Sequence, residues 1–243
     1  MTRNCSIPFT KNWYAPARPN PALPTCVHKG LFPQATTDRS PDLVKYADVR
    51  DVAKAAKDWP QLNFIVYHSA FRFVGGAQST GWEQFEKTGR IDWVTDLAEI
   101  PQKYGVKNVY GDLGQIFAQS TVAEPRLCAA MMGQLIKGLG VDHVVWGSDA
   151  VWTGAPQWQI EALRRLEISE EMQRKYGFAP PGLADGPVKT AIFGDNTARL
   201  YQFTRQQRSS LAQDSVTVAK AEYDLHGEGR TNLRYGYIQP RPA

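Results

Sequence analysis

Short apolar runs that end in a chemically useful polar residue recur along this chain. One run leads to His28, a second leads to His68, and a third, Val144 to Trp146, leads to Asp149. Runs of this length, rich in β-branched and aromatic residues, indicate buried strands. We therefore predict strands over residues 25–30, 63–68 and 144–149, and a fourth, weakened by its glycines, over 108–114.

Between these strands the apolar positions change to the spacing of helices. Apolar residues on one helical face, with Pro or Gly at the ends, predict helices over 48–58, 91–99, 125–137, 156–166, 187–193 and 196–201. Strand and helix thus alternate four times, which is typical of a parallel sheet with helices outside it. We predict that residues 69–90 form a long loop and that Pro101 breaks the helix before it.

The patterned part of the chain covers residues 25–203 and forms one predicted domain. Residues 1–24 contain five prolines and residues 204–243 turn polar, so we expect both flanks to be irregular. A closed eight-stranded barrel needs about 250 residues. The predicted fold is therefore an α/β barrel of the TIM type that is incomplete, with about four strand–helix units.

The polar ends of three strands define the candidate site. In parallel α/β folds the C-terminal ends of the strands carry the chemistry. One such residue is often only a hydrogen-bonded strand end, but His28, His68 and Asp149 together indicate a metal or general-base site. We expect the three side chains to converge in one pocket. Cys26 shares a strand face with His28, and we interpret it as a buried thiol rather than a ligand.

The composition limits the classes of partner. The chain has 243 residues and a formal net charge of only +4, with charges of both signs interspersed, which argues against nucleic acid. Its three cysteines contain no C-x-x-C pair, which is typical of a reducing compartment. No apolar run suffices to span a membrane or to form a signal peptide. We therefore expect a cytoplasmic protein that acts on a small molecule and binds neither nucleic acid nor a membrane.

Several segments, taken in order, resemble one family. They include Cys-Val-His-Lys-Gly-Leu (26–31), Asn-Phe-Ile-Val-Tyr-His-Ser (63–69), Val-Val-Trp-Gly-Ser-Asp (144–149) and Ile-Phe-Gly-Asp-Asn-Thr-Ala-Arg-Leu-Tyr (192–201). Together they resemble the metal-dependent amidohydrolase-related family, in the branch that also contains aminocarboxymuconate-semialdehyde-type decarboxylases. The resemblance runs over about residues 25–203 and matches the C-terminal half of the family's barrel.

The resemblance implies a distorted TIM barrel with a divalent metal, commonly zinc, at the C-terminal end of its strands. By position, His28 and Asp149 resemble metal ligands, and His68 resembles a histidine that binds metal or polarises the substrate. The implied catalytic residues are Asp149 and His68. Asp149 would accept the proton of a metal-bound water and pass it to the leaving group, while His68 holds the developing oxyanion.

One feature of that family is absent from this sequence. The family's first strand carries a His-x-His pair that supplies two further metal ligands, whereas no two of the four histidines here are separated by one residue. His143 lies six residues before Asp149, about 20 Å away at ~3.3 Å per strand residue, and His226 lies in the tail. Neither completes the ligand set, so we expect zinc to be weakly bound or absent.

Three functions stay open at this point. The chain is a hydrolase or metal-dependent decarboxylase of a small carboxylated or cyclic substrate, an inactive remnant that keeps the fold, or a half-barrel that assembles with another chain. Four strands leave two unpaired sheet edges and one open face. We expect that face to expose some of the strand residues Val27, Ile65, Val66, Val144, Val145 and Trp146. This exposure predicts a homo-oligomer or a loosely packed chain.

Overall fold

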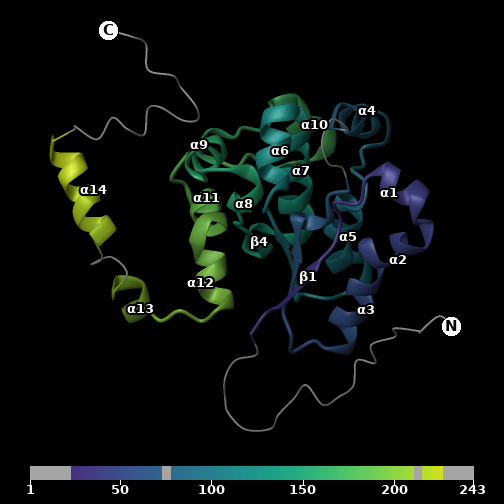
Figure 1. The fold of residues 1–243 in the computed structure, drawn as a ribbon, viewed down its shortest axis with the longest axis horizontal. Coiled ribbons are helices and arrows are strands. Elements are labelled where there is room, and N and C mark those ends of the chain that lie inside the picture. The colour runs from purple at the N-terminus through teal and green to yellow at the C-terminus, as the bar shows by residue number, and fades with distance from the viewer. Residues whose placement is uncertain (1–22, 73–77, 211–214, 227–243) are drawn as a thin grey trace.

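The computed structural model describes residues 23–72, 78–210 and 215–226, which form an α/β fold (Figure 1). Its centre is a parallel sheet in the order β1-β2-β3-β4, so β1 and β4 are its edges. The strands are β1 (Thr25–His28), β2 (Phe64–Tyr67), β3 (Val109–Asp112) and β4 (Val144–Val145). The predicted α/β class is confirmed, and all four predicted strands are present, although each is shorter than predicted and β4 already ends at Val145. The sheet has half the strands of a closed barrel.

Helices fill the connections between the strands. Between β1 and β3 lie α1 (Gln34–Arg39), the 3₁₀ turn η2 (Pro41–Leu43), α2 (Val44–Ala47), α3 (Arg50–Asp58), the 3₁₀ turn η3 (His68–Ala70), α4 (Gln78–Thr88) and α5 (Val94–Tyr104). Between β3 and β4 lie α6 (Ile116–Ala123), α7 (Pro125–Leu139) and the 3₁₀ turn η5 (Val141–His143). After β4 come α8 (Ala150–Thr153), α9 (Gln157–Arg165), α10 (Glu170–Tyr176), α11 (Pro187–Thr190), the π-helical turn η6 (Ala191–Asp195), α12 (Asn196–Leu200), α13 (Arg205–Ser210) and α14 (Ser215–His226).

The two faces of the sheet pack differently because successive strand side chains point to opposite faces. Phe64, Val66 and Val109 join the main core with the helices, and among the described helices α5 and α7 make the most extensive contact. Ile65 lies on the other face with Tyr110, Val145 and Leu200 of α12. The last helices of the barrel unit therefore cover part of the face that a closed barrel would bury.

Two buried asparagines fix the ends of the inner and edge strands. Asn108 Nδ2, just before β3, donates to the carbonyl oxygens of Ala56, Trp59 and Leu62 at 2.7–3.1 Å. Asn196 Nδ2 on α12 donates to the carbonyls of Val141 and Val144, both at 2.8 Å. Each amide satisfies buried carbonyls that would otherwise carry a desolvation cost. These bonds tie together the segments through which the chain enters β2, β3 and β4.

Three expectations about secondary structure are wrong. The predicted loop 69–90 contains α4, and Pro101 lies inside α5 instead of ending it. Burial of Leu97 and Ile100 in the core outweighs the one hydrogen bond that proline removes, and Gly105 in the left-handed conformation ends the helix instead. Helices α6 and α10 were also missed, because neither has a clear apolar stripe.

The segment after residue 203 also differs from expectation. It contains α13 and α14, which lie beside the main body in Figure 1 and whose described side chains are exposed. Polar helices without a core-facing stripe cannot be distinguished from an irregular tail by hydrophobic periodicity. The expected irregular segment 1–24 lies outside the described residues, apart from residues 23 and 24. Within the described residues, no helix is both long and apolar enough to cross a lipid bilayer.

Candidate functional site at the strand ends

His28 and His68 meet at the C-terminal ends of β1 and β2. Their rings are in edge-on contact, with centroids 4.7 Å apart and an interplanar angle of 70°. The two strands are parallel neighbours, with His28 paired to Tyr67, which places the following residue, His68, beside His28. His68 is buried and His28 is exposed. The pair therefore has one protected imidazole and one that solvent or a substrate can reach.

Asp149 lies close enough to His28 for its carboxylate to affect the pKa of that imidazole. The pKa of His28 is lowered from its ordinary 6.5, first by the partial desolvation of its ring and then by repulsion from His68, while the Asp149 carboxylate opposes the shift. Asp149 follows β4 and adopts the left-handed conformation, with φ of 51°. A Cβ placed on Gly114, just beyond β3, would lie 3.6 Å from the Asp149 Cβ. The ends of β1, β2 and β4 thus bring the three predicted residues to one edge of the sheet.

A short hydrogen-bond chain supports the turn at Asp149. Thr153 Oγ1 on α8 donates to the carbonyl oxygens of Ser148 and Asp149 at 2.8 and 3.0 Å. The fully buried Gln159 donates from Nε2 to Thr153 Oγ1 at 2.8 Å. A left-handed non-glycine residue costs of order 1–3 kcal/mol, so such bonds are needed to keep Asp149 in place.

Asp112, at the end of β3, is a fourth residue of this edge and was not predicted from the sequence. Its Oδ2 accepts hydrogen bonds from the backbone N–H groups of Gly114 (2.9 Å) and His68 (3.3 Å). Burial raises the pKa of Asp112, and these two hydrogen bonds oppose the rise. The sequence contains the feature that could have identified it, since β3 also ends in a carboxylate. Gly111 and Gly114 weaken the strand pattern around it. Glycine is required at 147, where a Cβ would clash with Asp112 Oδ1.

The expected metal site is not assembled by the described residues. Among them, no group of three or more His, Cys, Asp or Glu side chains is arranged to hold a metal ion. His68 Nδ1 is already bonded to the carbonyl oxygen of Gly114 at 2.9 Å. A catalytic zinc needs three protein ligands, and the residues in this part of the chain do not fit one.

Cys26 is exposed, so its interpretation as a buried thiol is wrong. The two faces of the edge strand β1 are not equally covered, and the face of Cys26 and His28 is the open one. The Cys26 side chain hydrogen-bonds Tyr67, which contributes first to raising the pKa of that phenol to about 12. Tyr201, after α12, also interacts with Cys26, which brings the C-terminal end of the barrel unit to this face.

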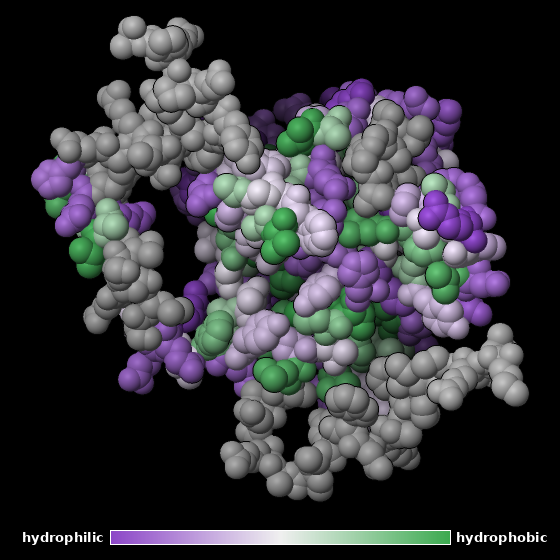
Figure 2. Space-filling model, in the orientation of Figure 1, coloured by the Kyte–Doolittle hydropathy of each residue, from purple (hydrophilic) through white to green (hydrophobic). Residues whose placement is uncertain are grey.

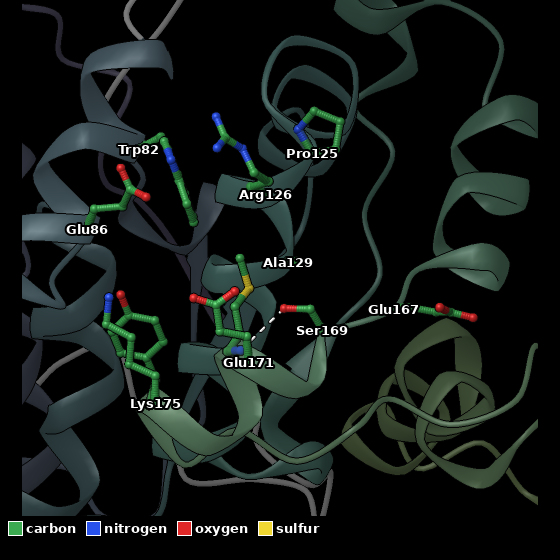
Figure 3. A pocket seen from close by; sticks show the side chains of 11 residues that line it. Trp82, Glu86, Pro125, Arg126, Ala129, Glu167, Ser169, Glu171 and Lys175 are labelled. Atoms are coloured by element: carbon green, nitrogen blue, oxygen red, sulfur yellow. Dashed lines mark hydrogen bonds between the residues drawn. The ribbon is translucent and has the colours of Figure 1, made fainter.

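A separate surface cavity of about 450 Å³ lies between α4, the beginning of α7 and α10 (Figure 3). Its wall includes Trp82, over which the Arg126 guanidinium lies at 4.6 Å, and the acidic residues Glu86 and Glu171. None of the four strand-end residues lines it. This cavity lies on the outer surface of the helices and is lined by side chains of both charges. We therefore place the candidate chemistry at the strand ends.

Comparison with solved structures finds distant similarities. They include a 5-carboxyvanillate decarboxylase from Sphingomonas paucimobilis (14% identity, TM-score 0.38) and a dihydroxybenzoic acid decarboxylase from Polaromonas with bound manganese and an inhibitor (14% identity, TM-score 0.37). In each case the match covers 75% of this chain and 50% of the other. The chain therefore spans about half the length of these structures. No curated protein sequence matches it.

A protein-family profile matches a large part of this chain. The profile described as amidohydrolase matches residues 11–203, most of the chain. The match confirms the predicted resemblance and extends it beyond the N-terminal boundary expected at residue 25. It also agrees with a four-stranded parallel sheet that has reactive residues at the ends of its strands. The chain belongs to the amidohydrolase-2 family, and its fold is an incomplete amidohydrolase-type barrel.

Proposed function

We propose that this chain is an amidohydrolase-type hydrolase or decarboxylase that acts on a small carboxylated or cyclic substrate at the His28–His68–Asp149 cluster. The observation that carries the proposal is the coupling of these residues. The two imidazoles are in ring contact at 4.7 Å, and the Asp149 carboxylate acts on the charge of His28. Family membership supports the reaction class.

The acid–base chemistry follows from the charge states at this edge. A lowered pKa leaves His28 neutral near pH 7, so its imidazole can accept a proton from water as the water oxygen attacks a substrate carbonyl. The Asp149 carboxylate stabilises the imidazolium that forms. His28 then returns this proton to the leaving group. His68, held beside His28, offers a second polar group to the substrate.

The family implies a divalent metal that would act as a Lewis acid and lower the pKa of a bound water. Because the described donors do not fit a three-ligand site, we assign no step to a metal. We expect well below one zinc or manganese ion per purified chain.

A second candidate is a non-catalytic binding protein. The observation in its favour is the same lack of three assembled metal ligands in the described part of the chain. In that case the cluster would bind family-type substrates without converting them. For either candidate we also propose a cytoplasmic location, since Cys26 and Cys128 are free thiols.

Turnover by the purified full chain, with metal content measured in parallel, tests the proposal. The substrates are hydroxylated benzoic acids for decarboxylation and cyclic esters for hydrolysis. We expect Asp149→Asn to lower kcat/KM by about 100-fold or more, the usual contribution of acid–base groups. Asp58→Asn is the matched control, because that carboxylate is exposed on α3 and pairs with Lys54.

Three results would change the conclusion. Ligand binding without turnover in the wild-type chain would favour the binding protein. Equal turnover in Asp149→Asn and wild type would remove this cluster as the site. One metal per chain, with turnover lost on chelation, would show that ligands beyond those identified complete a metal site.

A further inference from the structure

The buried carboxylate of Asp112 takes no part in the proton transfers proposed above. It is only 9% exposed, and Oδ2 accepts from two backbone N–H groups, those of His68 and Gly114. A second hydrogen bond joins the same two residues, because His68 Nδ1 lies 2.9 Å from the Gly114 carbonyl oxygen. One carboxylate therefore holds both partners of the bond made by the His68 imidazole.

That bond determines which nitrogen of a neutral His68 carries the proton. A backbone carbonyl only accepts hydrogen bonds, so the ring must donate from Nδ1. The remaining nitrogen, Nε2, then has a free lone pair. In this tautomer His68 can accept a proton or a hydrogen bond from a substrate through Nε2.

The backbone that carries His68 is strained and needs support. His68, Ser69 and Ala70 have φ values of 59°, 42° and 58°, all in the left-handed region. Residues other than glycine adopt this conformation only at a cost in free energy, because the Cβ crowds the following carbonyl oxygen. Two bonds hold this turn against the end of β3: Asp112 Oδ2 accepts from the His68 N–H, and Ser69 Oγ donates to the Asp112 carbonyl at 2.8 Å.

We propose that Asp112 is a positioning residue that fixes His68 in the Nδ1–H tautomer and leaves Nε2 as the free acceptor of the site. The carboxylate acts by holding the His68 and Gly114 backbones so that the Gly114 carbonyl faces Nδ1. Only the use of Nε2 in turnover rests on the proposed function. The tautomer itself is a property of the free protein.

Nitrogen-15 NMR of histidine-labelled full-length protein near pH 8 tests this, because neutral imidazole predominates well above its ordinary pKa of about 6.5. The chain has four histidines, and His68→Gln identifies the His68 signals. We expect a protonated Nδ1 and an unprotonated Nε2 in wild type. Asp112→Ala should mix the two tautomers. Asp112→Asn should keep the wild-type pattern, because the amide oxygen can replace Oδ2 as the acceptor.

Ser69→Ala is the matched control, since it removes the other bond between the same two segments and leaves the carboxylate intact. It should lower the melting temperature and leave the His68 tautomer unchanged. A protonated Nε2 in wild type would overturn the proposal, even if Asp112→Ala fails to fold. An unchanged tautomer in folded Asp112→Ala, or an equal change in Ser69→Ala, would also overturn it. A wild-type chain with the expected tautomer and no turnover would contradict only the proposed function.

Discussion

The His28 imidazole is the most informative single group at the strand ends. Burial and His68 lower its pKa, and Asp149 partly restores it. An exposed histidine that stays neutral near pH 7 can accept a proton from a water or a substrate. Because His28 is the exposed member of the pair and His68 the buried one, we propose different roles for them: His28 exchanges protons and His68 keeps a fixed orientation.

The pH dependence of turnover follows from this charge state. Below its pKa His28 is protonated and no longer a base, so kcat/KM should fall on the acid side with a midpoint below 6.5, the ordinary value. The measurement is kcat/KM from about pH 5 to about pH 8, the range in which histidine titrates. A midpoint above 6.5 would mean that another group is the base.

At the same scale, the sequence predicted three of the four residues at this edge. His28, His68 and Asp149 each end a clear apolar run, and strand ends in a parallel sheet share one edge. Asp112 was missed because glycines weaken the strand pattern before it. The lack of a three-donor metal arrangement depends on side-chain distances and on the bond from His68 Nδ1, which hydrophobic patterning does not specify.

At the scale of elements, buried strands and amphipathic helices were predictable, whereas tertiary packing decided the rest. Helix α5 continues through Pro101 because its apolar face is held against α7. Helices α4, α13 and α14 were missed because an uneven apolar pattern resembles a loop. The boundaries of the fold thus depend on contacts between elements that lie far apart in the sequence.

The contact of α5 with α7 depends on one glycine. A Cβ at Gly138 would overlap the carbonyl oxygen of Ala98, which is backbone and cannot rotate away. We expect Gly138→Ala to reduce the free energy of unfolding by about 1–3 kcal/mol, the usual cost of overpacking. Thermal melting measures this loss as a shift of several degrees.

Gly194→Ala is the control for that prediction, since a Cβ there would meet nothing within 4 Å. It should melt at or above the wild-type temperature, because alanine favours a helical turn. Equal melting temperatures for Gly138→Ala and wild type would contradict the close packing of α5 on α7.

At the scale of the whole molecule, the open sheet exposes less apolar surface than expected. Ile65, Val66, Val144 and Val145 are at most 5% exposed, and of the six strand residues named only Val27 and Trp146 are half-buried. Leu200 on α12 packs with three residues of the second face. Apolar exposure instead lies on the helices: Val151 and Trp152 of α8 are 89% and 78% exposed, and Figure 2 shows a hydrophobic area over α8.

The edges of the described sheet still favour association. The Thr25 N–H donates to the carbonyl oxygen of Asn63, just before β2. Because the backbone N–H groups of successive strand residues point to opposite sides, the Cys26 N–H points away from β2, toward the open edge of the sheet. Such an edge pairs readily with another chain. We expect the wild-type chain to sediment as an oligomer at tens of micromolar. Cys26→Pro, which removes that N–H, should shift it toward monomer. A wild-type monomer with a sharp, high melting transition would contradict edge pairing.

The central claim is that His28, His68 and Asp149 form one electrostatically coupled site. A histidine NMR titration of the metal-free chain tests it most directly, because it needs no substrate. His68→Gln should raise the pKa of His28 by removing a repulsive neighbour, and Asp149→Asn should lower it by removing an attractive charge. These opposite shifts are the predicted result. A His28 pKa that stays unchanged in both variants would contradict a single coupled site.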